Sequence, residues 1–259
     1  MVATLGRRGS LGHAGGSDNG NCGRAVMAVV LYERLCADDR RPSPFCWRAR
    51  LALAHKNVTP EIRAITFSEA DKVAFSGQTR VPLLVDGQTV VHDSWAIACH
   101  LEDAYPQAPS LFGGAGGRAL TRLFNHWVDH SLERALAPIL IPYLLAVACP
   151  EDRAYYRQTR EAKFGLTIEQ MTTRRAVYME ALQPVLEPLR QRLAETSFLC
   201  GERPGYADYL VFADFQWARS VCDRDLLGPE DKELRAWRSC MLDLFGGLAR
   251  SVPAFDTAA

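Results

Sequence analysis

The stretch Arg80-Val81-Pro82-Leu83-Leu84-Val85-Asp86-Gly87, followed by Asp93-Ser94-Trp95-Ala96-Ile97, decides the fold of this chain. Residues 83–85 and 89–91 are short apolar runs on either side of Asp86-Gly87, a pattern typical of a β-hairpin. The apolar spacing after Ser94 predicts a helix over 94–104. We therefore expect a strand entered through a proline, a hairpin, and a helix that opens on Asp-Ser.

The same alternation of strand and helix continues upstream of this stretch. The order of elements over residues 27–105 predicts an α/β thioredoxin-like domain. Ser-Pro-Phe-Cys at 43–46 lies between the first strand and the first helix of this domain. The predicted elements are a strand at 29–32, a helix at 44–56, a strand at 62–66 and an irregular helix at 68–79.

The rest of the chain reads as a linker and a second domain. Residues 106–117 are rich in Pro and Gly, which is typical of a linker. Residues 118–259 show helical periodicity without strand signals, so we expect an all-α helical bundle. The predicted helices are 118–148, 152–160, 167–194, 207–221 and 230–250. Residues 1–26 are rich in Gly and lack aromatics, so we expect a disordered extension, or a start assigned too early with Met27 as the natural one.

Composition excludes several classes of partner. The 30 basic and 30 acidic residues give a net charge of zero, which disfavours nucleic acid and anionic membrane surfaces as partners. The longest apolar run, at 136–148, is shorter than the roughly 20 residues that span a bilayer, so we expect no membrane segment. The eight cysteines form no CxxC pair and no zinc-site spacing. We therefore expect reduced thiols, a cytoplasmic location and no metal.

Val81-Pro82 is the first candidate for a binding role. A proline that enters a strand in this kind of fold is expected to be cis, which would turn the N–H and C=O of Val81 toward a cleft. A peptide lying antiparallel could then pair with Val81 as an added strand. The alternative is an ordinary proline on an edge strand.

Asp93 and Ser94 form the second candidate. At a helix start, the Ser94 hydroxyl and backbone N–H suit a carboxylate, and Asp93 suits an ammonium. An amino-acid head group, such as the γ-glutamyl end of glutathione, carries both charges. Simple capping of the helix is the competing interpretation.

Ser43 is the third candidate and the one closest to chemistry. Pro44 is favoured at the first position of a helix, so Ser43 lies beside the free N–H groups and the positive end of the helix dipole. Ser43 has no His or Asp placed nearby to act as a base, so it is a poor candidate for a nucleophile. Its hydroxyl is instead suited to donate a hydrogen bond to a bound thiolate. Cys46, in the first helical turn, is the rival for redox chemistry. We interpret Cys46 as a packed core thiol, because redox enzymes of this fold use the first position of the motif, here Ser43.

These residues resemble the glutathione S-transferase superfamily, with its thioredoxin-like first domain and helical second domain. The strings Ser43-Pro44-Phe45-Cys46-Trp47-Arg48, Val91-His92-Asp93-Ser94-Trp95 and Tyr206-Ala207-Asp208-Tyr209 are similar to the branch that holds bacterial β-etherases and related fungal transferases. The chain departs from the superfamily in two places. Asp93 stands where Glu or Gln is usual, and Gly205 stands where Ser or Thr usually caps a helix, so we expect Asp208 to be structural.

The resemblance implies a glutathione-dependent transferase. It implies that Ser43 activates the thiol, that Val81-Pro82 pairs with the cysteinyl backbone, that Asp93 and Ser94 hold the γ-glutamyl end, and that Arg80 is a weaker contact. It also implies a small aromatic or apolar substrate, attacked as in β-aryl ether cleavage, and a homodimer. The alternatives are a non-catalytic ligand carrier and a thiol-disulfide reductase that works through Cys46. The aromatic candidates for the pocket, none of which the sequence singles out, are Phe45, Trp127, Tyr143, Tyr155 and Phe215.

Overall fold

The computed structural model describes residues 28–255, so the expectation for residues 1–26 lies outside the described part of the chain. The first domain alternates strand and helix in the order that the sequence predicts. Its elements are β1 (Val29–Arg34), η1 (Ala37–Asp39), α1 (Pro44–His55), β2 (Glu61–Ile65), η2 (Ala70–Ser76), β3 (Leu83–Asp86), β4 (Thr89–His92) and α2 (Ser94–Ala104).

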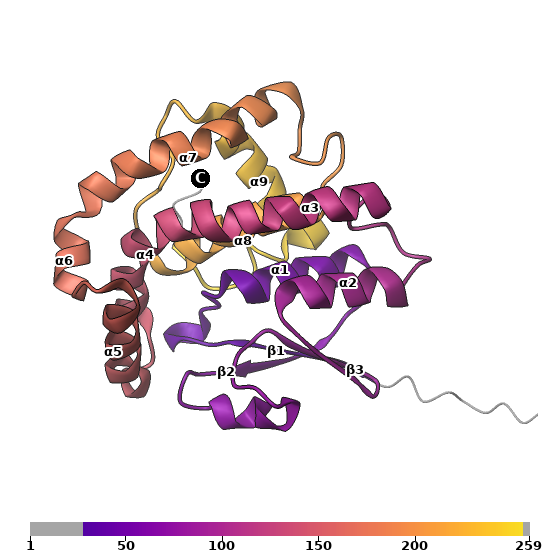
Figure 1. Ribbon diagram of the computed structural model, residues 1–259, viewed down its shortest axis with the longest axis horizontal. Coiled ribbons are helices and arrows are strands. Elements are labelled where there is room, and N and C mark those ends of the chain that lie inside the picture. Colours follow the sequence, from indigo (N-terminus) through magenta and orange to yellow (C-terminus); the bar gives the residue numbers. More distant parts are fainter. Residues whose placement is uncertain (1–27, 256–259) are drawn as a thin grey trace, which may run out of the picture.

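The four strands form one mixed sheet in the order β2-β1-β3-β4. β1 runs parallel to β2, whereas β1 with β3 and β3 with β4 are antiparallel pairs. This arrangement confirms the predicted thioredoxin-like domain. Helices α1 and α2 cover the face that is turned toward the second domain, and η2 covers the other face (Figure 1). Successive side chains of β1 point to opposite faces of the sheet. Leu31 packs into the large core, whereas Val30 and Tyr32 pack with Val73 of η2 on the other face.

The second domain is helical, as predicted, and none of its described residues belongs to a named strand. Its core is built mainly on α4 and α8, whose inward side chains are almost completely buried. No helix within residues 28–255 has the length and apolar character needed to cross a bilayer. The helices are α3 (Ala115–Trp127), α4 (Glu133–Val147), α5 (Arg153–Phe164), α6 (Ile168–Thr173), α7 (Arg175–Glu195), α8 (Tyr206–Val221) and α9 (Lys232–Gly247), with a π turn η3 (Val128–Leu132) and a short turn η4 (Pro150–Asp152).

Several predicted helix boundaries in this domain are wrong, among them the end of α5, which lies at Phe164 and not at residue 160. α3 begins at Ala115, inside the predicted linker, because Gly117 serves a close approach: a Cβ there would lie 1.9 Å from the carbonyl oxygen of Phe112. The glycine thus reflects packing at the helix start and not a flexible linker. The predicted helix 167–194 is divided at Arg174, which has φ −88° and ψ 7°. Apolar periodicity continues on both sides of Arg174, so the pattern could not reveal the break.

The two domains meet where α1 packs against α8, and polar side chains fix this contact. Arg48 of α1 is fully buried and forms a 2.6 Å ion pair with Asp129 and a 3.8 Å pair with Asp214 of α8. At the other end of α1, His55 Nδ1 lies 2.6 Å from the Tyr209 hydroxyl. These contacts hold the domains in one relative position, which defines the shape of the cleft between them.

Candidate functional site

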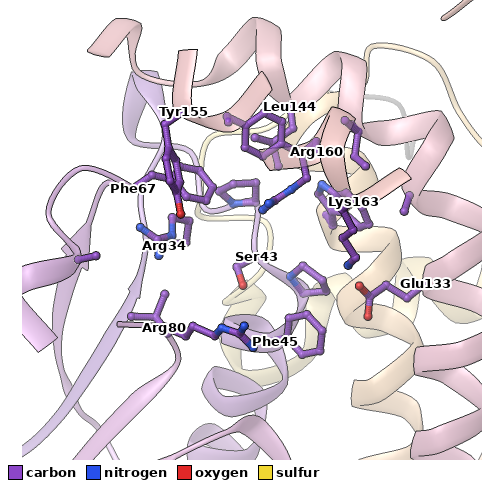
Figure 2. Close-up of a pocket in the computed structure, with 18 of the residues that line it drawn as sticks. Arg34, Ser43, Phe45, Phe67, Arg80, Glu133, Leu144, Tyr155, Arg160 and Lys163 are labelled. Carbon is purple, nitrogen blue, oxygen red and sulfur yellow. The ribbon is translucent and has the colours of Figure 1, made fainter. Parts of the chain in front are cut away.

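A cavity of about 580 Å³ opens between the two domains, within the range of small-molecule sites. Its walls come from the first domain on one side and from α4, α5 and α8 on the other (Figure 2). The cavity is lined by Arg34, Pro42, Ser43, Pro44, Phe45, Phe67, Ala70, Thr79, Arg80, Val81, Glu133, Ala137, Ile141, Leu144, Tyr155, Tyr156, Arg160, Lys163, Phe164 and Trp217.

Ser43 lies at the N-terminus of α1 and lines this cavity. Its hydroxyl oxygen accepts a 3.3 Å hydrogen bond from the backbone N–H of Cys46, and Pro44 occupies the first helical position. The Ser43 hydroxyl also makes a side-chain hydrogen bond with the Cys46 thiol, so a negatively charged group in the cavity would compete with that thiol for the hydroxyl proton. In Figure 2 the Ser43 side chain stands near the middle of the cavity, between Arg80 and Arg160.

Val81 and Arg80 line the same cavity, and the Val81–Pro82 peptide bond is cis, as the sequence predicts. Pro82 is buried behind them at the start of β3. The Arg80 side chain is exposed, and its backbone is held by Gln78, which accepts from the Arg80 N–H and donates to its carbonyl at 2.6 Å each. The structure thus brings Ser43, Arg80 and Val81 to one site, although they are far apart in the sequence.

Asp93 and Ser94 lie at the start of α2 but not among the residues that line the cavity. Asp93, not Ser94, is the cap: its Oδ1 accepts from the N–H groups of Trp95 at 3.0 Å and Ala96 at 3.1 Å. Within residues 28–255, its Oδ2 makes no hydrogen bond. Ser94 is 3 % exposed, and its carbonyl accepts a 2.8 Å hydrogen bond from the Tyr206 hydroxyl. Capping of the helix therefore uses Oδ1 of Asp93, whereas Oδ2 remains able to bind a ligand.

Cys46 is only 2 % exposed, in agreement with its interpretation as a core thiol. Burial, together with the negative charge of Glu33, raises the pKa of the Cys46 thiol to about 12, although a hydrogen bond with Ser43 acts to lower it. A thiol with this pKa is protonated at neutral pH, and the thiolate is the reactive form.

Sequence reasoning missed the charged side chains of the cavity. Arg34, Arg160 and Lys163 line it together with one acid, Glu133. Burial raises the pKa of Glu133 above its ordinary value of 4.5, although the nearby Arg48 lowers it. Arg160 and Lys163 are three residues apart on α5, so their spacing predicts a shared face, but not the cavity beneath it.

The aromatic candidates divide into two groups. Phe45 and Tyr155 line the cavity, and Trp217, which the sequence did not single out, joins them. Trp127 instead stacks on Phe124, with 5.3 Å between ring centroids. The remaining two, Tyr143 and Phe215, lie outside the cavity lining as well.

Asp208 is a structural residue. It is fully buried, and its carboxylate accepts hydrogen bonds from the backbone N–H groups of Leu199 (2.7 Å), Cys200 (3.2 Å) and Gly205 (3.0 Å) and from the Trp237 indole (2.9 Å). In a capping box, the third helical residue accepts a hydrogen bond from the N–H of the cap, and the side chain of the cap accepts one in return. Asp208 makes the first of these bonds with Gly205, and the second is lost because glycine has no side chain. In the described part of the chain, no group of three or more His, Cys, Asp or Glu side chains is placed to hold a metal ion.

Comparison with known proteins places both halves of the chain in one family. Residues 42–104 match the family model of the glutathione S-transferase N-terminal domain, and residues 119–241 match that of the C-terminal domain. A glutathione S-transferase-like protein of Aspergillus flavus is 26% identical over 171 residues, which are 62% of this chain and 57% of that protein. Glutathione S-transferase 4 of Zea mays is 27% identical over 175 residues, covering 66% of this chain and 71% of that protein.

Solved structures share the fold over most of the chain. The crystal structure of a glutathione S-transferase of Ceriporiopsis subvermispora in complex with glutathione superposes with a TM-score of 0.74 at 23% identity, covering 87% of this chain and 99% of that one. A glutathione transferase from Phanerochaete chrysosporium gives a TM-score of 0.70 at 24% identity, covering 88% and 99%.

Proposed function

Because this chain belongs to the glutathione S-transferase superfamily, we propose that it is a glutathione-dependent transferase in which Ser43 stabilises the thiolate of bound glutathione. One observation carries this proposal: Ser43 and Val81 line the same cavity between the domains, with Ser43 at a helix N-terminus. The helix terminus and the Ser43 hydroxyl proton, once it turns from the Cys46 thiol to the ligand, both favour a negative charge at this point.

Glutathione would lie along the first-domain wall of the cavity and extend beyond the cavity lining to the start of α2. Its cysteinyl backbone pairs with Val81, beside Pro82, in the manner of an added strand. The ammonium of its γ-glutamyl end meets the free Oδ2 of Asp93, and the carboxylate meets the N–H and hydroxyl of Ser94. Arg80, which lines the cavity with an exposed side chain, supplies a contact to a carboxylate of the peptide.

The Ser43 hydroxyl and the helix N-terminus together can supply the free energy needed to lower the pKa of the glutathione thiol. A free thiol has a pKa of about 8.5 and is only a few per cent ionised at neutral pH. Lowering this pKa by about two units requires roughly 2.7 kcal/mol. A charge-assisted hydrogen bond contributes about 1.5–3 kcal/mol, and a helix N-terminus adds about 0.3–1 kcal/mol.

We propose an aromatic electrophile as the second substrate, with β-aryl ether cleavage as one such reaction. Apolar side chains of α4 and α5 and the ring of Trp217 on α8 face the glutathione wall across the cavity, and the ring of Phe45 lies on the first-domain side. The thiol proton leaves to solvent, and the thiolate forms a C–S bond at the carbon beside an aryl ketone. The C–O bond breaks, and the phenoxide departs with the electron pair. Phenoxide leaves without acid assistance, so alignment and an activated thiolate suffice.

The test is release of a fluorescent phenol from a β-aryl ether ketone, with and without glutathione, in the wild type and in Ser43→Ala. Release that depends on both glutathione and Ser43 supports ether cleavage and the thiolate mechanism together. Absence of release while glutathione still binds would exclude ether cleavage and leave another electrophile or the carrier function. The reductase alternative loses support from the structure, because the Cys46 thiol is buried and its pKa is raised to about 12.

We further propose a cytoplasmic homodimer. Leu120 and Leu123 on α3 are 70% and 69% exposed, and their spacing places them on one helix face. On the first domain, Phe75 and Val90 are also exposed. Large apolar side chains that face solvent in pairs are typical of contact surfaces. Contact of each first domain with the partner's helical domain would cover both sets.

A further inference from the structure

The charges around the cavity exceed what glutathione neutralises. Four cationic side chains line it, whereas Glu133 is the single acid among its lining residues. The four cations are Arg34, Arg80, Arg160 and Lys163. Glutathione carries two carboxylates and one ammonium, so even as the thiolate it brings a net charge of about −2. A positive charge therefore remains in the occupied cavity.

None of these four cations forms an ion pair with a carboxylate of residues 28–255. The Arg34 guanidinium donates to the carbonyls of Ile65 and Thr66 and lies 4.3 Å from the Phe67 ring centroid. The Arg160 guanidinium lies 4.7 Å from the Tyr156 ring centroid, and it donates to the Thr159 hydroxyl at 3.3 Å and to the Tyr156 side chain. No ion pair therefore neutralises Arg34 or Arg160, whereas the Lys163 ammonium interacts electrostatically with Glu133.

The two walls separate the cations by domain. Arg34 and Arg80 belong to the wall along which glutathione would lie, whereas Arg160 and Lys163 come from α5 on the opposite wall (Figure 2). Figure 2 shows Arg160 pointing into the cavity and Lys163 pointing toward Glu133. Asp152, at the N-terminus of α5, accepts hydrogen bonds from the N–H groups of Phe67 at 2.9 Å and Ser68 at 2.7 Å.

Building on the proposed function, we propose that the second substrate is an anionic aromatic compound whose carboxylate binds Arg160 and Lys163. A planar guanidinium matches a carboxylate with two parallel hydrogen bonds, and a nearby ammonium adds a point charge. The stacking of Arg160 on Tyr156 limits the freedom of its side chain, so less entropy is lost on binding. The aromatic body of the substrate then lies toward Phe45, Trp217 and the thiolate.

Glu133 makes the site selective for substrates with a single anionic group. Its carboxylate lies on the same wall of the cavity and faces Lys163, so a second anionic group placed there would be repelled. The site therefore favours a substrate with one anionic group, bound at the α5 end of the cavity. A dianionic substrate would bind less well.

The experiment compares an unreactive pair of ligands that differ in one charge, dinitrobenzoate and dinitrobenzene. Their dissociation constants are measured by calorimetry with saturating glutathione, for the wild type, Arg160→Gln, Arg160→Lys, Lys163→Gln and Arg157→Gln. Arg157 is the matched control: it lies on the same helix but outside the cavity lining, paired with Glu161 at 3.1 Å and Glu169 at 2.8 Å.

We expect the wild type to bind dinitrobenzoate at least about tenfold more tightly than dinitrobenzene. This preference should fall about tenfold in Arg160→Gln. It should fall only about threefold in Lys163→Gln, because the Lys163 side chain is exposed and its charge is screened by solvent. Arg160→Lys should restore part of it, and Arg157→Gln should retain it. An unchanged preference in Arg160→Gln, or an equal loss in Arg157→Gln, overturns the proposal. So does a loss of glutathione affinity in Arg160→Gln that matches the loss for dinitrobenzoate.

Turnover separates this inference from the function on which it rests. Chlorodinitrobenzene and chlorodinitrobenzoate are conjugated with glutathione, and each rate is divided by the rate without enzyme. Turnover of neither compound and no phenol release from the β-aryl ether ketone, with the binding preference intact, refutes the transferase but leaves the anion site. Turnover of chlorodinitrobenzene without any preference for the carboxylate form, in binding or in rate, refutes the anion site and leaves the transferase.

Discussion

The Tyr206 hydroxyl donates a 2.8 Å hydrogen bond to the backbone carbonyl of Ser94, and both residues are buried. Tyr206 opens α8 in the second domain, and Ser94 opens α2 in the first. The bond therefore joins the helical domain to the turn that we propose holds the γ-glutamyl end of glutathione. Removing it should affect glutathione binding as well as stability.

Tyr206→Phe is expected to lower the free energy of unfolding by about 1 kcal/mol and to raise KM for glutathione severalfold. Tyr209→Phe is the matched control, because Tyr209 on the same helix makes its hydrogen bond to His55, at 2.6 Å. Urea unfolding and steady-state kinetics measure the two effects. If KM for glutathione rises equally in both variants, the bond to Ser94 has no specific role.

Cys46 should be inert toward alkylating reagents and dispensable for conjugation. Its thiol is buried with a pKa raised to about 12, whereas Cys240 is exposed. We expect iodoacetamide to label Cys240 well before Cys46, and glutathione to form no mixed disulfide at Cys46, as read by mass spectrometry. Cys46→Ala should keep its glutathione-conjugating activity. An adduct at Cys46 in the folded protein would revive the reductase alternative.

Asp214 should make the protein less stable as pH rises. Burial raises the pKa of its carboxyl well above 3.8, while Arg48, 3.8 Å away, lowers it and Glu133 and Asp129 raise it. Neither carboxylate oxygen has a hydrogen-bond partner. A raised folded-state pKa gives stability that is complete below the unfolded value and is lost as pH rises through the folded one.

Asp214→Asn cannot ionise, so it escapes this loss. The difference in unfolding free energy, variant minus wild type, should become more positive between about pH 4 and pH 8. Urea denaturation at both values measures it, and groups that titrate equally in both proteins cancel. A difference that becomes more negative over this range would show that Asp214 is stabilised as a carboxylate by Arg48.

Replacing the exposed leucines of α3 should produce monomers. Leu120→Glu combined with Leu123→Glu places like charges on the face that we propose as the dimer contact. Val177→Glu is the control, since Val177 on α7 is 61% exposed but lies on another helix. Analytical ultracentrifugation should show dimers for the wild type and the control and monomers for the α3 variant. A monomeric wild type would refute the dimer.

Local signals account for the parts of the fold and site that the sequence predicts. Pro44 after Ser43 marks a helix start, and Asp86-Gly87 between apolar runs marks a hairpin, because each depends only on neighbouring residues. The order of elements along the first domain and the position of Ser43 at a helix start followed from such signals, whereas the cis bond before Pro82 was expected from the kind of fold. The identity of the helix cap at Asp93 did not, because Asp and Ser are equally good caps.

The charged half of the site could not be predicted from local signals. Arg160 and Lys163 lie on a helix that looks like any solvated amphipathic helix until it is packed beside the first domain. Trp217 lies in a helix whose side chains are almost all buried, so its apolar pattern does not distinguish a cavity wall from a core. These positions depend on the contact between domains, which involves residues far apart in the sequence.

The most direct test of the central claim is the pKa of the thiol of enzyme-bound glutathione. It is measured by ultraviolet absorbance of the thiolate as a function of pH, in the wild type and in Ser43→Ala. We predict a value about two units below the free value of about 8.5 in the wild type, and a value close to the free one in Ser43→Ala. An equal pKa in the two proteins, with glutathione bound to both, would contradict the role of Ser43.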